Sequence, residues 1–180
     1  KSQADLEMAL HKISGRENVE YVTMDMCDPY RNFVNSFFPQ AKIVADKFHI
    51  IRLLSPILMK KRKEITGSRA DARAKGLLLM SSKKLGYFER LALYRFLERF
   101  PELHEIYSWK ERIHRFYRIK GYYKAYTAFK QLTFEMAFSE LPEIKSLRNT
   151  LLKWKEEILN YFASQLTNAR LEGFNNKAKG

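Results

Sequence analysis

Cysteine and long apolar runs are what this sequence most clearly lacks. Cys27 is its single cysteine, which excludes an internal disulfide and gives no support to a thiolate zinc site. No segment approaches the ~20 apolar residues that a membrane-spanning helix needs. Residues 1–10 also lack the pattern of a signal peptide. The sequence therefore predicts a chain of a reducing compartment with no part in a membrane.

Acidic residues are scarce relative to basic ones. With 33 Lys/Arg against 20 Asp/Glu the formal net charge is +13, and the pI is about 9.8. Such a charge favours polyanionic partners: DNA, RNA or an anionic membrane. The balance is uneven, because residues 1–46 carry 5 basic and 7 acidic side chains, whereas residues 47–180 carry 28 and 13. The long second part supplies the positive field.

A strand–helix–strand pattern occupies the first quarter of the chain. The β-branched and aromatic segment Val19–Met26 predicts a strand. The helix after it is expected to have Asp28 as N-cap, Pro29 in its first turn and Pro39 at its end. The apolar segment Ala41–Ala45 predicts a second, buried strand. The short links imply a right-handed parallel crossover, so the two strand ends meet at one edge of the sheet.

An acidic residue stands at the end of each predicted strand. Asp25 and Asp46 are poorly placed for a plain core and well placed to bind Mg²⁺, which prefers carboxylate oxygens, water and phosphate. A third acid, Glu172, lies far downstream. Asp46 can equally be only the N-cap of the next helix. His49, one turn on, can pair with Asp46 or pack as an ordinary histidine.

Beyond Asp46 the pattern is helical almost throughout. At 180 residues the chain is one domain, or one domain with a large insertion. Two more helices are expected near the ends of the chain: Ser2–Ile13, with Gly15 as its stop, and a last one from Thr167 or Asn168 that carries Glu172. Between them, helices are predicted at 46–63, 68–84 (less regular), 85–100, 101–119, 122–138 and 142–162.

Five short segments are distinctive: V-T-M-D-M at 22–26, D-P-Y at 28–30, F-F-P-Q-A at 37–41, A-D-K-F-H at 45–49 and T-N-A-R-L-E-G-F-N-N-K at 167–177. They resemble the bacterial insertion-sequence transposases of the DDE type. The resemblance spans essentially the whole chain, and its first and last segments are the most specific. It implies an α/β but mostly helical fold, in which a large all-α insertion interrupts an RNase H-like core.

The resemblance also assigns roles to the acids. In such folds the first aspartate lies on the first strand, the second after the fourth strand, and the glutamate on the last helix. By this resemblance the strand predicted at Val19–Met26 corresponds to the fourth strand of such folds. Asp25 and Glu172 are then the second and third catalytic acids and ligate the metal. Asp46 and His49 match a supporting D-x-x-H element. The remaining strands and the first aspartate are expected upstream of Lys1; the alternative is a triad of Asp25, Asp46 and Glu172.

The resemblance implies three segments: a partial RNase H-like core at 1–50, a helical insertion at 51–163 and a C-terminal core helix at 164–180. It implies cleavage of transposon ends and joining of their 3′ hydroxyls to target DNA, with Mg²⁺ or Mn²⁺ as cofactor. The partner is double-stranded DNA, and such enzymes usually work as multimers. The expected location is the bacterial cytoplasm, at the nucleoid. If the first aspartate is missing, the isolated chain is expected to be inactive.

Candidate DNA-binding residues are cationic. A run at 60–63 and the basic, aromatic stretch 109–130 can track a phosphate backbone, or can be solvated faces of helices. These candidates are Lys60, Lys61, Arg62, Lys63, Arg112, Arg115, Arg118 and Lys177.

The aromatic residues of the stretch 109–130 have two interpretations. They can stack on exposed bases, as Tyr117, Tyr122, Tyr123 and Tyr126 would. They can also form the core of the insertion. The second interpretation is favoured by the near-helical spacing of Ile113, Phe116, Tyr123 and Ala128.

Two other functions fit parts of the pattern. One is a non-catalytic helical DNA-binding or assembly module in which the acids are structural. The other is a different RNase H-like nuclease, which would share the site without the segment at 167–177. A shared metal ion requires the carboxylates of Asp25 and Glu172 to lie within ~6–8 Å of each other, which separates catalytic from structural acids.

Overall fold

The computed structural model describes residues 14–67 and 72–164. The predicted helix Ser2–Ile13 and the last predicted helix, with Glu172 and Lys177, lie outside the described residues. The chain divides into two compact units. We call the described residues up to Asp46, together with those from Trp154 on, the sheet unit. We call Lys47–Lys153 the helical unit.

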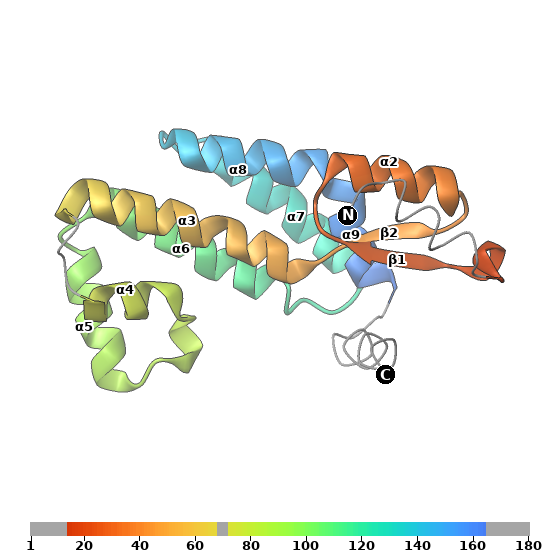
Figure 1. Ribbon diagram of the computed structural model, residues 1–180. Helices are drawn as coiled ribbons and strands as arrows, with labels where there is room; N and C mark the ends of the chain where they lie inside the picture. Colours follow the sequence, from red (N-terminus) through yellow and green to blue (C-terminus); the bar gives the residue numbers. More distant parts are fainter. Residues whose placement is uncertain (1–13, 68–71, 165–180) are drawn as a thin grey trace. The chain divides into compact units, whose positions relative to one another are not determined.

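The sheet unit contains a two-stranded parallel sheet (Figure 1). Strand β1 is Tyr21–Met24 and β2 is Lys42–Ala45, with Tyr21 opposite Lys42 and Met24 opposite Ala45. Around them stand η1 (Arg16–Asn18), α2 (Asp28–Phe37) and α9 (Lys155–Ala163). The prediction of a mostly helical α/β chain with two parallel strands is confirmed.

Helix α2 begins one residue earlier than the sequence predicted. Cys27, with an extended backbone, is the N-cap, and Asp28 is already the first helical residue. The prediction of Asp28 as N-cap was therefore wrong, because a propensity for capping does not fix a boundary to a single residue. Pro29 lies in the first turn as expected, and the carboxylate of Asp28 still faces the positive end of the helix dipole.

The core of the sheet unit lies between α2 and the two strands. Phe33, Val34 and Phe38 from the α2 segment pack with Ile43 of β2. From helix α9, the side-chain amide of Asn160 donates a 2.8 Å hydrogen bond to the carbonyl oxygen of Ile43. Residues from opposite ends of the chain therefore hold β2 in place.

Arg31 joins α2 to the start of α9. Its guanidinium lies 3.6 Å from the centre of the Trp154 ring, and its Nε lies 2.8 Å from a carboxylate oxygen of Glu157. A cation over an indole face is attracted by the ring quadrupole. This contact orders the buried Trp154 at the point where α8 gives way to α9.

The single helix predicted at 142–162 is in fact two helices. Helix α8 ends at Lys153 and α9 begins at Lys155, with Trp154 at φ −106°, ψ 21° between them. No Gly or Pro marks this break, so the helical pattern ran through it. The break follows from tertiary packing of Trp154, which sequence periodicity does not report.

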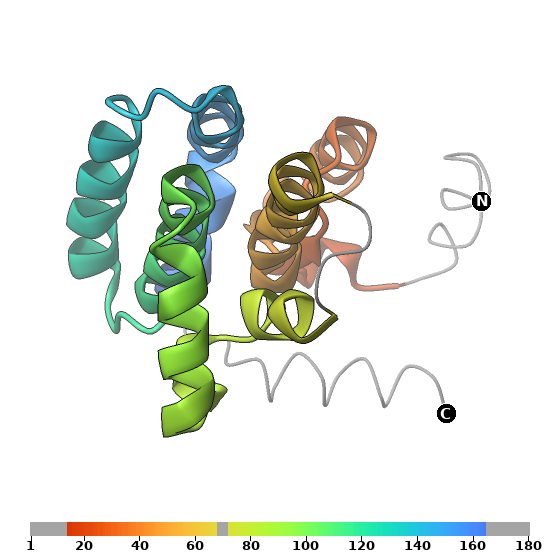
Figure 2. The same cartoon turned by 90° about the vertical axis from the view of Figure 1, so that its left-hand side faces the viewer.

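The helical unit is built from α3 (Lys47–Thr66), α4 (Ala72–Leu79), η2 (Ser82–Lys84), α5 (Tyr87–Leu97), α6 (Pro101–Phe116), α7 (Tyr122–Met136) and α8. Helix α6 packs along α3, and α7 packs against both α6 and α8 (Figure 2). Among the described helices, none has the length and apolar character that crossing a bilayer demands.

The aromatic stretch 109–130 forms much of this unit's core. Trp109, Ile113 and Phe116 of α6 are buried, as is Phe129 of α7. The prediction that Tyr123 belongs to this core was wrong, because its side chain is 85% exposed. The buried residues of α7 recur at helical spacing and form one face of the helix; they are Ala125, Phe129, Leu132, Thr133 and Met136.

Lys110 is an unusual member of the helical core, with 2% of its side chain exposed. From α6 its Nζ donates hydrogen bonds to the carbonyl oxygens of Leu78 (2.7 Å) and Met80 (2.5 Å), where α4 ends. The carboxylate of Glu111 lies 3.4 Å away. Burial lowers the pKa of Lys110 to about 8, against the opposing effect of Glu111. Lys110 thus caps α4 and ties it to α6.

We predict that Lys110 makes the stability of the protein rise between pH 8 and pH 9.5. Above pH 8 the ammonium group of Lys110 loses its proton in the native state. In the unfolded chain, where a lysine has a pKa of about 10.4, it keeps the proton. The burial penalty is then relieved, by at most about 1.4 kcal/mol per pH unit. Urea unfolding of Lys110→Met should lack this rise, and the exposed-site control Lys83→Met should retain it. Parallel pH profiles for wild type and Lys110→Met would contradict the assignment.

Candidate metal centre

The register of the sheet places two aspartates at the same edge. Met24 pairs with Ala45, and the Asp46 amide donates a 2.9 Å hydrogen bond to the Met24 carbonyl oxygen. Asp25 and Asp46 are therefore the next residues after a matched pair, at the carboxyl ends of parallel strands. After Asp25 the chain turns at once, since the Cys27 amide donates a 2.8 Å hydrogen bond to the Asp25 carbonyl oxygen.

Asp25, Asp46 and His49 each offer one potential ligand atom, and these atoms all lie within 4.8 Å of one another. Asp25 is exposed, and the other two are half-buried. His49 is in the first turn of α3, three residues after Asp46, so one turn of backbone keeps it close to that aspartate. All three residues are site candidates predicted from the sequence.

The donor set fits a divalent cation. Two carboxylates are the ligands that Mg²⁺ and Mn²⁺ prefer, and an added imidazole suits the softer of the two ions, Mn²⁺. Without a cation, two carboxylates this close repel each other. The exposed position of Asp25 leaves room for water and for a phosphate oxygen of a substrate.

Glu172, the third acid expected at the site, lies outside the described residues. The assignment of Glu172 as a metal ligand stays a prediction.

The four cations at 60–63 have different environments. Arg62 is buried, with 4% of its surface exposed. Lys61 lies 3.1 Å from Glu102 and 3.2 Å from Glu143, and the hydrogen bond with Glu102 is the main cause that raises its pKa. Lys61 therefore links α3 to α6 and α8, and Arg62 is buried within the fold. Lys60 and Lys63 are exposed, and Lys60 lies 3.9 Å from a carboxylate oxygen of the exposed Glu64 one turn on.

The cations of α6 also divide. Arg112 pairs with Glu135 of α7 and lies over the Trp109 ring, which gives it a structural role. Arg115 and Arg118 are exposed. Lys177 lies outside the described residues.

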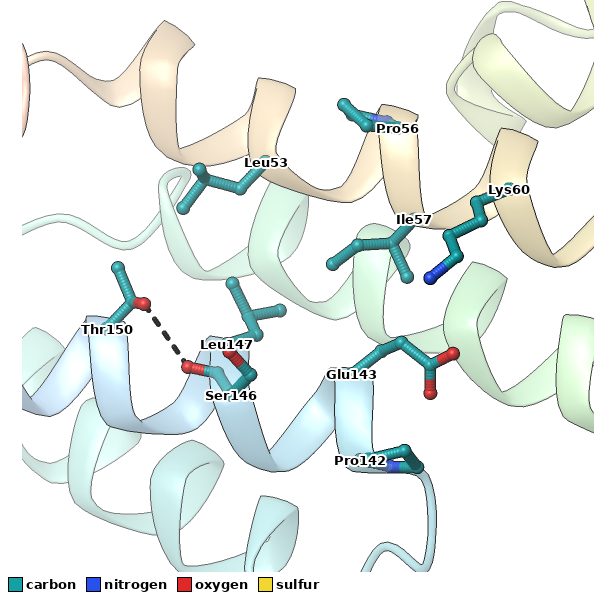
Figure 3. A pocket seen from close by; sticks show the side chains of 9 residues that line it. All are labelled: Leu53, Pro56, Ile57, Lys60, Pro142, Glu143, Ser146, Leu147 and Thr150. Carbon is teal, nitrogen blue, oxygen red and sulfur yellow. Dashed lines mark hydrogen bonds between the residues drawn. The ribbon is translucent and has the colours of Figure 1, made fainter.

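An apolar groove runs between α3 and α8 in the helical unit (Figure 3). It has a volume of about 610 Å³, and Leu53, Ile57 and Leu147 point into it. Lys60 and Glu143 lie at one end, and at the other the Thr150 hydroxyl donates to the Ser146 carbonyl oxygen. Its lining holds one carboxylate, so it is not a second metal centre.

Comparison with known families decides the identity of the chain. A family model described as Transposase, that of the ISL3-type DDE transposases, matches residues 1–180. The chain belongs to this transposase family. The prediction of an insertion-sequence transposase of the DDE type is thereby confirmed. A search of curated proteins found no match, and a search of solved structures found none either.

Membership of this transposase family bears on the sheet edge where Asp25 and Asp46 lie. Transposases act on DNA, and DDE transposases generally use a divalent metal. In this transposase, Asp25, Asp46 and His49 form a group that could hold such an ion, and they are the only such group of three or more acids, cysteines or histidines within residues 14–67 and 72–164. The edge of the sheet is therefore the candidate metal centre.

We predict that a divalent cation stabilises the protein through Asp25 and Asp46. Binding to the folded state alone raises stability by RT ln(1 + [L]/Kd), about 2.7 kcal/mol at a hundredfold excess over Kd. Thermal unfolding with Mn²⁺ should shift upward by several degrees in wild type and not in Asp25→Asn or Asp46→Asn. The control is Asp28→Asn, a nearby exposed aspartate outside the group, which should shift like wild type. An equal shift in all four proteins would remove the assignment.

Proposed function

We propose that this transposase cleaves transposon ends and joins the freed 3′ hydroxyls to target DNA by metal-dependent phosphoryl transfer. The observation that supports this most is the convergence of Asp25, Asp46 and His49 at one sheet edge. Parallel α/β sheets bind their ligands at this edge, where the loops after the strands diverge.

The aspartates would hold the cofactor, Mg²⁺ or Mn²⁺. A divalent ion bound there supplies Lewis-acid stabilisation of a phosphate and activation of the attacking oxygen. Asp25 and Asp46 would fix its position from two backbone segments that the strand ladder already orders. His49 would hydrogen-bond Asp46 or provide a third ligand, and its place on α3 couples it to Asp46 by a single helical turn.

Two further acids complete the proposal. Glu172 would act from the last helix as a metal ligand, and a first catalytic aspartate would be supplied from upstream of Lys1. Residues 1–50 and 164–180 would then belong to an RNase H-like core, and 51–163 would form its helical insertion. Asp46 would support the site and not replace the first aspartate.

The DNA would be held by the positive field of the helical part. Residues 47–180 carry 28 basic and 13 acidic side chains. Phosphate contacts give most of the salt-dependent affinity for DNA. Among the predicted cations in the described segments, the exposed Lys60, Lys63, Arg115 and Arg118 are suited to this role. Lys61, Arg62 and Arg112 would act through the fold.

The experiment uses the full-length natural protein and a DNA fragment carrying the ends of the element that encodes it. With Mn²⁺ or Mg²⁺, Asp25→Asn and Glu172→Gln should each lower the rate of end cleavage about a hundredfold or more, because each removes charge that positions the reacting groups. Binding of the same DNA in EDTA should stay within about twofold of wild type.

The matched control is Asp28→Asn, which should cleave at the wild-type rate. Unchanged cleavage by Asp25→Asn and Glu172→Gln would refute the catalytic proposal. It would leave a helical DNA-binding module in which the acids are structural.

A further inference from the structure

The outer face of α7 exposes large aromatic side chains. Tyr123 is 85% exposed and Phe134 64%, and Phe138, just past the end of the helix, is 71% exposed. Tyr123 and Phe134 are eleven residues apart, close to three turns, so they share one face about 16 Å apart along the axis. The rings of Phe134 and Phe138 form an edge-to-face pair with centres 5.0 Å apart. Rings this exposed bury little of their surface in the fold.

The same face is cationic. Lys124 and Lys130 are exposed on it, and Thr127 and Gln131 add uncharged polar groups. Glu135 is the one acid of α7, and it is bound by Arg112 and by the Gln131 side-chain amide. No unpaired carboxylate of α7 therefore accompanies the rings.

A shallow groove of about 290 Å³ adjoins this face between α6 and α7. Arg112, Arg115 and Gln131 provide its polar groups, and Phe116 and Leu132 are among its apolar ones. Gln131 belongs to both the groove and the outer face. In Figure 2, α7, in teal, forms one edge of the helical unit, so its outer side is not covered by the unit's other helices.

We propose that this surface, the outer face of α7 with the adjoining groove, binds an unpaired DNA strand. The rings of Tyr123, Phe134 and Phe138 stack on bases, and Lys124, Lys130 and Arg115 contact phosphates. Base stacking on aromatic side chains combined with a cationic track is how proteins hold single strands without reading their sequence. The proposal rests on the proposed function, which makes DNA the substrate, and adds the form of DNA that this surface takes.

Other occupants fit the surface less well. A duplex buries its base faces, so exposed rings would gain little from it, whereas a separated strand offers them. A second copy meeting this face through its own would oppose lysines to lysines, and the one acid of α7, Glu135, is already paired with Arg112. An acidic protein would satisfy the lysines, but it has no need of flat rings, and an aliphatic side chain would serve it equally.

That difference defines the test. Affinity of the full chain for a fluorescent 20-mer of deoxythymidine and for a 20-base-pair duplex is measured by anisotropy in EDTA, which keeps the metal centre out of the result. The variants are Phe134→Ala, Phe134→Leu, Phe134→Trp and the double variant Phe134→Ala with Phe138→Ala. The control is Phe88→Ala, another exposed phenylalanine, 77% exposed on α5.

We expect the alanine and leucine variants to bind the single strand about fivefold to a hundredfold more weakly. Phe134→Trp and Phe88→Ala should bind it as wild type does, and duplex binding should change less than twofold throughout. Because Phe134 lies at the surface, all variants should keep the wild-type unfolding midpoint.

Wild-type single-strand affinity in the double variant overturns the proposal. So does full retention by Phe134→Leu, which would indicate an apolar protein contact, or an equal loss for strand and duplex. Failure of wild type to bind either DNA would instead count against DNA as the substrate, and so against the proposed function itself.

Discussion

Parallel pairing of β1 with β2 is the constraint on which the rest of the site depends. The hydrogen bond from the Asp46 amide to the Met24 carbonyl oxygen is the last of the strand ladder, and each strand is followed at this point by an aspartate, Asp25 or Asp46. A slip of one residue would move Asp46 away from Asp25 and turn the buried Ile43, Val44 and Ala45 to the wrong faces. The hydrophobic core of the sheet unit therefore fixes the separation of the two carboxylates.

Positive charge in this transposase serves two purposes that the sequence does not separate. Lys61, Arg62 and Lys110 are buried or ion-paired and hold helices together, at the cost of desolvation that neighbouring acids and carbonyl oxygens offset. The exposed cations and the rings of α7 contribute nothing comparable to the fold. These exposed groups are the ones that can contact a polyanion, so only part of the net charge of +13 is available for binding.

The sequence predicted the parts of the fold that local pattern controls. The alternation of apolar segments around Asp28-Pro29 was enough for the strand–helix–strand order, and the strand-end positions of Asp25 and Asp46 followed from it. Tertiary packing controls the rest. Trp154, buried and covered by Arg31, lies at a break between two helices, and Tyr123 faces outward while Ala125 and Phe129 fill the core. The break at Trp154 has no local signal in the sequence, whereas the buried face of α7 has one in the helical spacing of Ala125, Phe129, Leu132 and Met136.

Binding of a metal ion by Asp25 and Asp46 at the sheet edge is the central claim for this transposase. Anomalous X-ray diffraction from crystals of the protein grown with Mn²⁺ measures this most directly. We predict one strong anomalous peak at ~2.2 Å from carboxylate oxygens of both Asp25 and Asp46, lost in crystals of Asp46→Asn. Saturating Mn²⁺ with no peak between these two carboxylates, or a peak that survives the substitution unchanged, would contradict the account.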